Sequence, residues 1–205
     1  MTRVKICGLK IAESVHVATK ERADMVGFVF AKSKRQLTLQ EAKQLAKDVP
    51  PSVLKVGVFV NERLENVLTI AQQVPLDVIQ LHGHETDEYI QKIPYPTIKA
   101  LGIRTEEDVK SLSNYPSATY MLVDAPIAGS GETFNWALLK NVQQPLILAG
   151  GLHINNVEEA IRTVNPYMVD VSSGVETNGQ KDSEKIKQFI QRAKQGEMTD
   201  DRSND

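Results

Sequence analysis

Residues 3–30 read RVKICGLKIAESVHVATKERADMVGFVF and contain the unit that decides the fold of the whole chain. Two short runs rich in Val and Ile, at residues 3–7 and 25–30, enclose a longer interval. Runs of this length and composition are typical of buried β-strands, and the interval is long enough for a helix. Consecutive strands joined in this way are parallel and have a right-handed crossover. The stretch therefore predicts a strand–helix–strand unit.

The same alternation continues along almost the whole chain. Six more strand candidates follow the first two, at residues 54–60, 77–82, 97–101, 120–125, 145–150 and 168–173. The intervals between them have apolar residues at helical spacing, as in the two series Leu39, Ala42, Leu45, Ala46, Val49 and Leu64, Val67, Leu68, Ala71, Val74. Thr38 with Glu41 and Asn155 with Glu158 have the spacing of helix N-caps. A last helix is expected at residues 182–194.

Eight strand–helix pairs predict an α/β fold, a single-domain (β/α)8 TIM barrel over residues 1–195. An open, doubly wound sheet is the alternative fold. It usually has fewer strands, and no Gly-x-Gly-x-x-Gly motif follows the first strand to favour it. Residues 196–205 are polar, and we expect them to form a disordered tail.

Composition excludes several classes of function. The 205 residues have a formal net charge of -2 and no long basic run, so nucleic acid is not expected as a partner. No apolar run reaches the roughly 18 residues of a membrane helix. The single cysteine cannot form an internal disulfide, and the chain begins without a signal peptide. These features predict a cytoplasmic protein that does not bind membranes.

Active sites of TIM barrels lie at the carboxyl ends of the strands. In this chain those ends contain the polar or small residues Cys7, Asn61, His82, Asp124, Gly150, Gly151, Ser172 and Ser173. Strand alternation directs Lys5 and Cys7 inward, with Asp124, His82 and Asp170 also on inward faces. Strand eight is next to strand one in a closed barrel, and a buried lysine needs a partner. We therefore expect an ion pair between Lys5 and Asp170.

Cys7 and Asp124 are candidates for acid–base chemistry. Each also has a structural interpretation, since a lone cysteine is often a small buried apolar residue and Asp124 could cap a loop. A neighbouring cation such as Lys5 would lower the pKa of the Cys7 thiol and make it a useful base. A carboxyl group in an apolar barrel mouth can serve as a general acid. The pair suits proton transfers on a small substrate.

Two loops and one arginine indicate an anionic substrate. Gly150-Gly151 ends strand seven and Ser172-Ser173 ends strand eight, the positions at which TIM barrels often bind phosphate through backbone N–H groups. Arg35 follows strand two; it is either a solvated surface charge or a bidentate clamp for a carboxylate. The pair His82 and His84 does not supply the three protein ligands of a catalytic zinc site, so no metal is expected.

Seven segments together make the chain resemble the phosphoribosylanthranilate isomerase family over about residues 3–194. They are KICGL, GFVFAKSKR, VGVFVN, VIQLHG, GSGETFNW, LAGGL and VDVSSGVE, in this order along the chain. The resemblance implies an Amadori rearrangement in tryptophan biosynthesis. In it, N-(5-phosphoribosyl)anthranilate becomes 1-(2-carboxyphenylamino)-1-deoxyribulose 5-phosphate. No cofactor or metal is implied, because the substrate nitrogen supplies the electron sink.

The same resemblance implies roles for individual residues. Cys7 would be the general base and Asp124 the general acid. The remaining substrate-binding residues would be Arg35 for the anthranilate carboxylate, His82 and Asp170 in the pocket, Gly151, Ser173 and Gly174 around the phosphate, and Gly129, Ser130 and Gly131 in a closing loop. Asn135 departs from the aspartate usual at its position in the family, although asparagine also caps helices well.

Competing functions remain for such a barrel. A phosphosugar epimerase would bring metal-ligand histidines to the mouth, and a synthase would bring a catalytic lysine, for which Lys5 and Lys99 lie too deep. A non-catalytic barrel that binds a phosphorylated metabolite would lack the acid or the base. The sequence leaves the oligomeric state open between a monomer and a homodimer, with a small phosphosugar as the expected binding partner.

Overall fold

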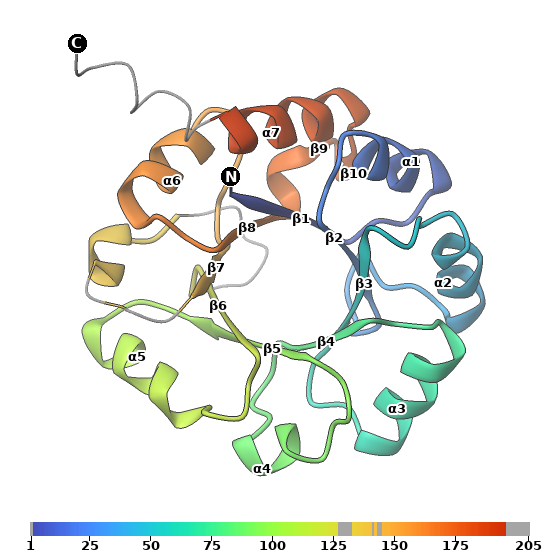
Figure 1. Cartoon of the computed structure of the whole chain (residues 1–205), viewed down its shortest axis with the longest axis horizontal. Helices are drawn as coiled ribbons and strands as arrows, with labels where there is room; N and C mark the ends of the chain where they lie inside the picture. Colours follow the sequence, from blue (N-terminus) through green and yellow to red (C-terminus); the bar gives the residue numbers. More distant parts are fainter. Residues whose placement is uncertain (1, 127–132, 141, 143–144, 196–205) are drawn as a thin grey trace.

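The computed structural model describes residues 2–126, 133–140, 142 and 145–195. Within these residues, eight parallel strands form a closed barrel in the order of the sequence, with β1 hydrogen-bonded to β8 (Figure 1). The strands are β1 (Arg3–Cys7), β2 (Met25–Val29), β3 (Leu54–Phe59), β4 (Val78–Leu81), β5 (Thr97–Gly102), β6 (Tyr120–Asp124), β7 (Leu146–Leu148) and β8 (Met168–Val171). The predicted (β/α)8 barrel is confirmed, and the open sheet is excluded.

Helices surround the barrel on all sides (Figure 1). The α-helices are α1 (Ala12–Lys20), α2 (Leu39–Ala46), α3 (Leu64–Gln73), α4 (Asp87–Ile90), α5 (Glu106–Lys110), α6 (Val157–Val164) and α7 (Ser183–Gln195). Three short 3-10 helices are η1 (Ser111–Asn114), η2 (Trp136–Leu139) and η3 (Ser173–Val175). Between β6 and β7 the described residues contain η2 in place of an α-helix. Asn135 caps η2, and its Oδ1 accepts a hydrogen bond of 3.1 Å from the backbone N–H of Ala137.

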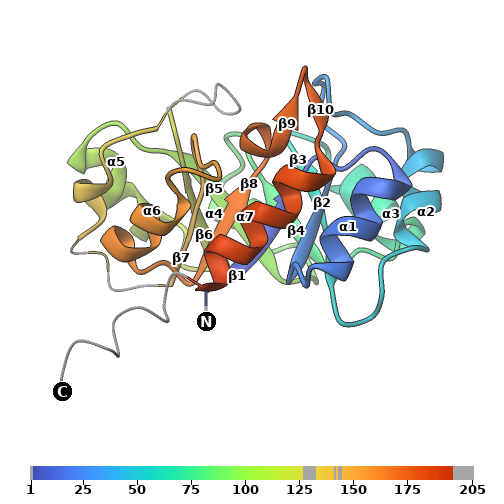
Figure 2. The same cartoon turned by 90° about the horizontal axis from the view of Figure 1, so that it is seen from above.

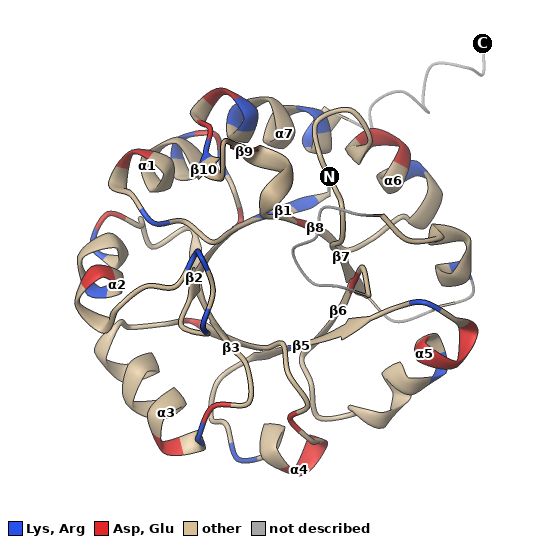
Figure 3. Ribbon diagram, turned by 180° about the vertical axis from the view of Figure 1, so that it is seen from behind, with Lys and Arg blue, Asp and Glu red and all other residues tan. Residues whose placement is uncertain are grey.

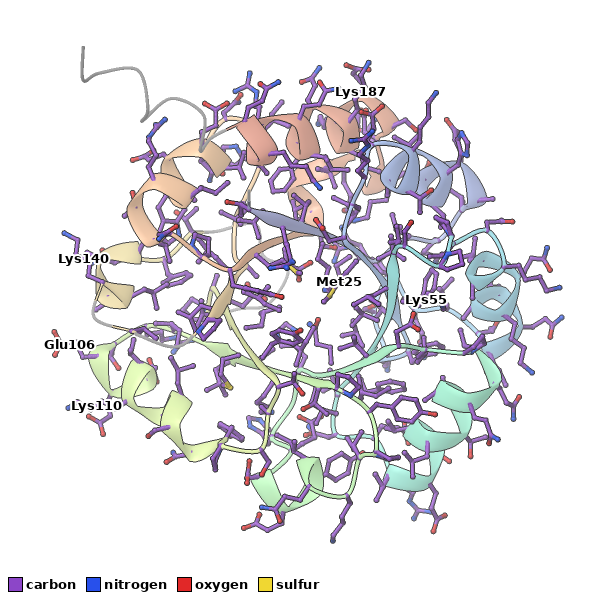
Figure 4. All side chains as sticks on the ribbon, viewed as in Figure 1. Met25, Lys55, Glu106, Lys110, Lys140 and Lys187 are labelled. Atoms are coloured by element: carbon purple, nitrogen blue, oxygen red, sulfur yellow. The ribbon has the colours of Figure 1, made fainter. Side chains whose placement is uncertain are left out.

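Two apolar layers hold the fold together. Val4 and Ile6 of β1 pack outward against the helices, within the larger cluster that α7 completes with Ile186, Phe189 and Ile190. The second, smaller cluster fills the barrel interior, where Figure 4 shows the side chain of Met25. Both layers follow from the alternation of side chains along a strand, as expected for a sheet covered by helices.

Of the two N-caps predicted from the sequence, one is confirmed by the structure and the other is wrong. Thr38 caps α2 in a full capping box, because its side chain accepts from the Glu41 N–H and the Glu41 carboxylate accepts from the Thr38 N–H. The predicted cap at Asn155 is wrong. The boundary residue of α6 is Asn156, and its side chain makes loop contacts instead of capping the helix. The last helix begins at Ser183, one residue later than predicted.

A β-hairpin follows β8 and was not expected from the sequence. Its strands are β9 (Glu176–Thr177) and β10 (Gln180–Lys181), which pair antiparallel. Asn178 and Gly179 form the turn, with φ of 52° and 78°. In the side view the hairpin stands at the end of the barrel opposite to the N-terminus, which is the carboxyl end of the strands (Figure 2).

Charged residues lie mainly on the outer helices and the loops, whereas the strands are largely uncharged (Figure 3). The described part of the chain contains no helix long and apolar enough to cross a membrane. The predicted tail at residues 196–205 lies outside the described residues.

Candidate active site

A cavity of about 270 Å³ opens at the carboxyl end of the barrel. Its lining brings together residues that are far apart in the sequence, from β1, from the ends of β4, β6 and β8, and from the loop after β2. The predicted site residues among them are Cys7, Arg35, His82, Asp124 and Asp170. The ordered strand ends of a parallel barrel explain this convergence, because they all meet at one rim.

Cys7 is the last residue of β1, and it is 8% exposed. Gly27 on the neighbouring strand leaves room for its thiol, because a Cβ there would lie 2.8 Å from Cys7 Sγ. Lys5 acts to lower the pKa of the Cys7 thiol, as expected, but the net shift is upward. Burial raises the pKa of Cys7, and this effect exceeds the opposing influence of the Lys5 ammonium. The negative charge of Asp170 acts in the same direction as burial.

Lys5 and Asp170 form the predicted ion pair. Lys5 Nζ lies 3.0 Å from Asp170 Oδ2, and the Lys5 side chain is fully buried. Burial alone would lower the pKa of Lys5, but the charges of Asp170 and Cys7 raise it above the usual value. Since Asp170 neutralises Lys5 directly, only part of the Lys5 charge acts on the thiol.

Asp124 ends β6, and its two carboxylate oxygens have different surroundings. Oδ1 accepts a hydrogen bond of 2.7 Å from the backbone N–H of Ala125. Oδ2 lies 3.4 Å from His82 Nε2. On the other side of the imidazole ring, Nδ1 lies 3.4 Å from the side-chain nitrogen of Gln80. An amide N–H of Gln80 donating to Nδ1 corresponds to the tautomer with the ring proton on Nε2, on the side of Asp124.

A second buried ion pair joins β5 to the loop after β4, which contains His82. Lys99 Nζ lies 2.9 Å from Glu85 Oε2, and it also donates to the carbonyl of Gly83 at 2.6 Å. The same carboxylate accepts from the backbone N–H groups of Asn61 and Gly83. Hydrogen bonds to these donors outweigh burial and lower the pKa of Glu85. This cluster makes residues 82–85 a rigid support for the imidazole.

Arg35 already clamps a carboxylate of the protein. Its Nε and Nη2 donate to the two oxygens of Glu176 at 2.6 and 3.0 Å, and its side chain is 13% exposed. The interpretation of Arg35 as a freely solvated surface charge is therefore wrong. A guanidinium group has five N–H donors, so a two-point contact leaves others available. Arg35 lines both this cavity and a larger one of about 500 Å³, between the loops after β1 and β2 and the hairpin.

The loops after β7 and β8 lie against each other. Gly150 and Gly151 have φ of 82° and 62°, which L residues rarely adopt. Asn156 stabilises this turn, since its Nδ2 donates to the Gly151 carbonyl at 3.0 Å. Gly174 approaches the Leu152 backbone so closely that a Cβ would collide with the carbonyl oxygen. Gly151, Gly174 and the adjoining Ser173 thus meet at one place on the rim.

Some predicted residues fall elsewhere, and others were missed. Gly129, Ser130 and Gly131 lie outside the described residues. The sequence interpretation gave no role to Glu176 or Lys181, which the hairpin brings next to Arg35 and Ser172. The signal that could have located them is Asn178-Gly179, the dipeptide most typical of a tight hairpin turn. Among the described residues, no three His, Cys, Asp or Glu side chains converge as a metal site.

Comparisons with known proteins identify the family of the chain. Residues 4–192 match the model of the family described as N-(5'phosphoribosyl)anthranilate (PRA) isomerase. An N-(5'-phosphoribosyl)anthranilate isomerase from Streptococcus mutans is 51% identical over 197 residues, covering 95% of this chain and all of the relative.

Two solved structures are also similar. The phosphoribosyl anthranilate isomerase of Thermotoga maritima is 42% identical, with a TM-score of 0.90 over 95% of this chain and 99% of that one. Another phosphoribosyl anthranilate isomerase, 42% identical with a TM-score of 0.86 and the same coverage, is in complex with reduced 1-(o-carboxyphenylamino)-1-deoxyribulose 5-phosphate. The chain therefore belongs to the N-(5'-phosphoribosyl)anthranilate isomerase family.

Proposed function

We propose that this enzyme isomerises N-(5-phosphoribosyl)anthranilate to 1-(2-carboxyphenylamino)-1-deoxyribulose 5-phosphate in tryptophan biosynthesis, with Cys7 as general base and Asp124 as general acid. The proposed activity is based on membership of the N-(5'-phosphoribosyl)anthranilate isomerase family. The observation that supports the two residue roles is that Cys7 and Asp124 line the same cavity of about 270 Å³. A base and an acid on different strands can then act on different atoms of one small substrate.

The reaction is a redistribution of protons. Asp124 gives a proton to the ribose ring oxygen, and the C1–O bond breaks to leave a cationic imine between C1 and the anthranilate nitrogen. The imine acidifies the C2 proton, which Cys7 takes, and the electron pair forms an enolamine. Tautomerisation to the ketone moves the hydroxyl proton at C2 to C1. Cys7 then holds the proton from C2, the proton from Asp124 remains on the former ring oxygen, and proton exchange with solvent resets both residues.

His82 prepares Asp124 for this role. An imidazole N–H directed at Oδ2, 3.4 Å away, stabilises the carboxylate that remains after proton transfer. Asp170 Oδ1 is buried and makes no hydrogen bond within the described part of the chain. Because Asp170 lines the cavity, a small rotation of its carboxylate would let this oxygen accept from a sugar hydroxyl group.

The two ends of the substrate are held separately in this proposal. The N–H groups of Arg35 that Glu176 does not use bind the anthranilate carboxylate. Gly151, Ser173 and Gly174 bind the phosphate through backbone N–H groups and a hydroxyl. No cofactor takes part in this proposal. The protein acts as a monomer or a homodimer. Its single, unpaired cysteine is consistent with the reducing environment of the cytoplasm.

The experiment follows the loss of phosphoribosylanthranilate fluorescence, with the labile substrate made in situ from anthranilate and phosphoribosyl pyrophosphate. Cys7→Ser and Asp124→Asn should each lower kcat by about 10²- to 10⁴-fold. Asp48→Asn, at an exposed position, loses the same charge as Asp124→Asn and serves as its control. Turnover that survives in folded Cys7→Ser would disprove the role of the base. No turnover in the unaltered protein would indicate a barrel that only binds its ligand.

A further inference from the structure

Lys181 lies in an unusual place for a lysine. It ends the hairpin that follows β8, and its side chain is 4% exposed although the hairpin itself stands at the surface. Burying an ammonium group is costly unless the protein compensates its charge and its hydrogen bonds. A buried lysine beside a reaction centre, with no role in the chemistry already described, requires an explanation.

The protein itself satisfies the whole ammonium group. Lys181 Nζ donates to the Ser172 carbonyl at 2.8 Å, to Ser172 Oγ at 3.2 Å and to Glu176 Oε1 at 2.9 Å. An ammonium group has three N–H donors, so none remains for a substrate. Any effect of Lys181 on the reaction must therefore pass through its neighbours or through its charge.

One of these neighbours leads directly to Cys7. Ser172 Oγ accepts from Lys181 and donates to the Cys7 carbonyl oxygen at 3.0 Å. A continuous chain of hydrogen bonds thus joins Glu176, Lys181, Ser172 and the backbone of Cys7. It holds the loop after β8 against the end of β1.

The charge of Lys181 is only partly compensated. Lys34, Arg35 and Lys181 all contact the carboxylate of Glu176, so three cations share one negative charge. In contrast, Lys5 has Asp170 to itself. Burial is the main influence on the pKa of Cys7 and raises it, but Lys181 acts to lower it. Among the described residues, the charged or titratable groups that face Cys7 or share its cavity are Lys5, Lys32, Arg35, His82, Asp124, Asp170 and Lys181.

We propose that Lys181 is a positioning residue for Cys7: it ties the loop after β8 to the Cys7 backbone and keeps a positive charge that Glu176 only partly compensates near the thiol. The inference rests on the proposed role of Cys7 as the base. It gives the hairpin a function in catalysis, because the hairpin delivers the cation that favours the thiolate.

Alkylation of Cys7 by iodoacetamide, measured as a function of pH, tests the proposal. The chain has one cysteine, so the signal is unambiguous. Lys181→Gln should displace the alkylation profile to higher pH and slow alkylation near neutrality by about threefold. Lys185→Gln is the control, because it also removes one positive charge. Lys185 lies on α7, and its Nζ donates to the backbone carbonyl oxygen of Glu176 and not to the carboxylate. Its profile should coincide with that of the unaltered protein.

Glu176→Gln separates electrostatics from a disturbance of structure. Removing the shared carboxylate leaves its cations unopposed, so the alkylation profile should move to lower pH, opposite to Lys181→Gln. Lys181→Arg keeps the charge and should restore most of the original profile. The proposal is overturned if folded Lys181→Gln titrates like the unaltered protein, or if Glu176→Gln moves the profile in the same direction as Lys181→Gln. Should Lys181→Gln fail to fold, the direction in Glu176→Gln decides alone.

Turnover distinguishes this inference from the proposed function. If Cys7 is the base, the rising limb of kcat/KM against pH should move with the alkylation profile in each variant. If the alkylation profile moves but the pH dependence of kcat/KM does not, Cys7 is not the base. The effect of Lys181 on the pKa of the thiol would still be supported. If neither the alkylation profile nor kcat/KM moves in folded Lys181→Gln, the Lys181 proposal alone is rejected.

Discussion

Lys5 and Asp170 form an ion pair across the seam at which β1 meets β8, with 3.0 Å between Nζ and Oδ2. The two residues are register partners on adjacent strands although they are separated by nearly the whole chain. The pair lies directly below the proposed base. It therefore connects closure of the barrel with the electrostatics of the site.

Breaking this pair should destabilise the protein more than replacing it. Asp170→Asn leaves the Lys5 ammonium buried without a counter-charge, which should reduce the free energy of unfolding by about 3 kcal/mol. The double variant Lys5→Met/Asp170→Leu replaces both charges with apolar groups and should recover much of that loss. Urea unfolding followed by circular dichroism measures both. Equal stabilities of the Asp170→Asn variant and the unaltered protein would show that the pair contributes nothing.

Much of this site was predictable because it follows from strand alternation. Once β1 and β8 were recognised, the period of two placed Lys5, Cys7 and Asp170 inward, and closure of the barrel made the first and the last of these neighbours. The pKa of Cys7 was not predictable in the same way. The sequence shows that Lys5 is near, but the effect of burial and the neutralisation by Asp170 depend on three-dimensional packing.

The surroundings of Arg35 were beyond the sequence for a different reason. Its partner Glu176 is 141 residues away and reaches it only because β9 and β10 form a hairpin. Strands of two residues are too short to produce a hydrophobic pattern, so only the turn dipeptide Asn178-Gly179 could have indicated them. The helix boundary predicted at Asn155 was one residue early, which is the usual uncertainty of a helix end, and the side chain at the true boundary, Asn156, does not cap the helix.

Arg35 should determine how the substrate carboxylate is held. Arg35→Lys keeps the positive charge but loses the planar fork, so KM for phosphoribosylanthranilate should rise by about tenfold with a smaller change in kcat. Lys34→Ala, in the same loop and also paired with Glu176, is the control and should leave KM nearly unchanged. Inhibition by inorganic phosphate should be the same in both variants, since neither residue is assigned to the phosphate. An unchanged KM in Arg35→Lys would exclude the carboxylate contact.

Glu176 should stabilise the fold in a pH-dependent way. Burial raises the pKa of its carboxyl group, but hydrogen bonds from Arg35 and Lys181 outweigh burial and hold the pKa at about 2, below the usual 4.5. A depressed pKa contributes stability above the unfolded value, and that contribution is lost as pH falls toward the folded value. The stability difference between the unaltered protein and Glu176→Gln should therefore be largest above pH 4.5 and shrink toward pH 2.

Urea unfolding of both proteins at several pH values measures this difference. Comparing the two removes the contribution of the other carboxyl groups, which titrate in both. A difference that stays constant from neutral to acid pH would show that the ionised form of Glu176 is not specifically stabilised by the fold.

Gly174 should be required for the contact between the loops after β7 and β8. A Cβ at this position would collide with the Leu152 carbonyl oxygen, so Gly174→Ala must push the two loops apart. We expect a loss of about 1–3 kcal/mol in stability, the usual cost of overpacking. Because these loops are proposed to bind the phosphate, KM should rise and competitive inhibition by inorganic phosphate should weaken.

Gly179→Ala is the matched control, since its Cβ would meet only Lys34 Nζ, at 3.9 Å. The positive φ of Gly179 makes that control mildly destabilising as well, without touching the phosphate loops. If inhibition by phosphate weakens equally in both variants, the effect is due to general destabilisation. If inhibition is unchanged in Gly174→Ala, the phosphate does not bind at these loops.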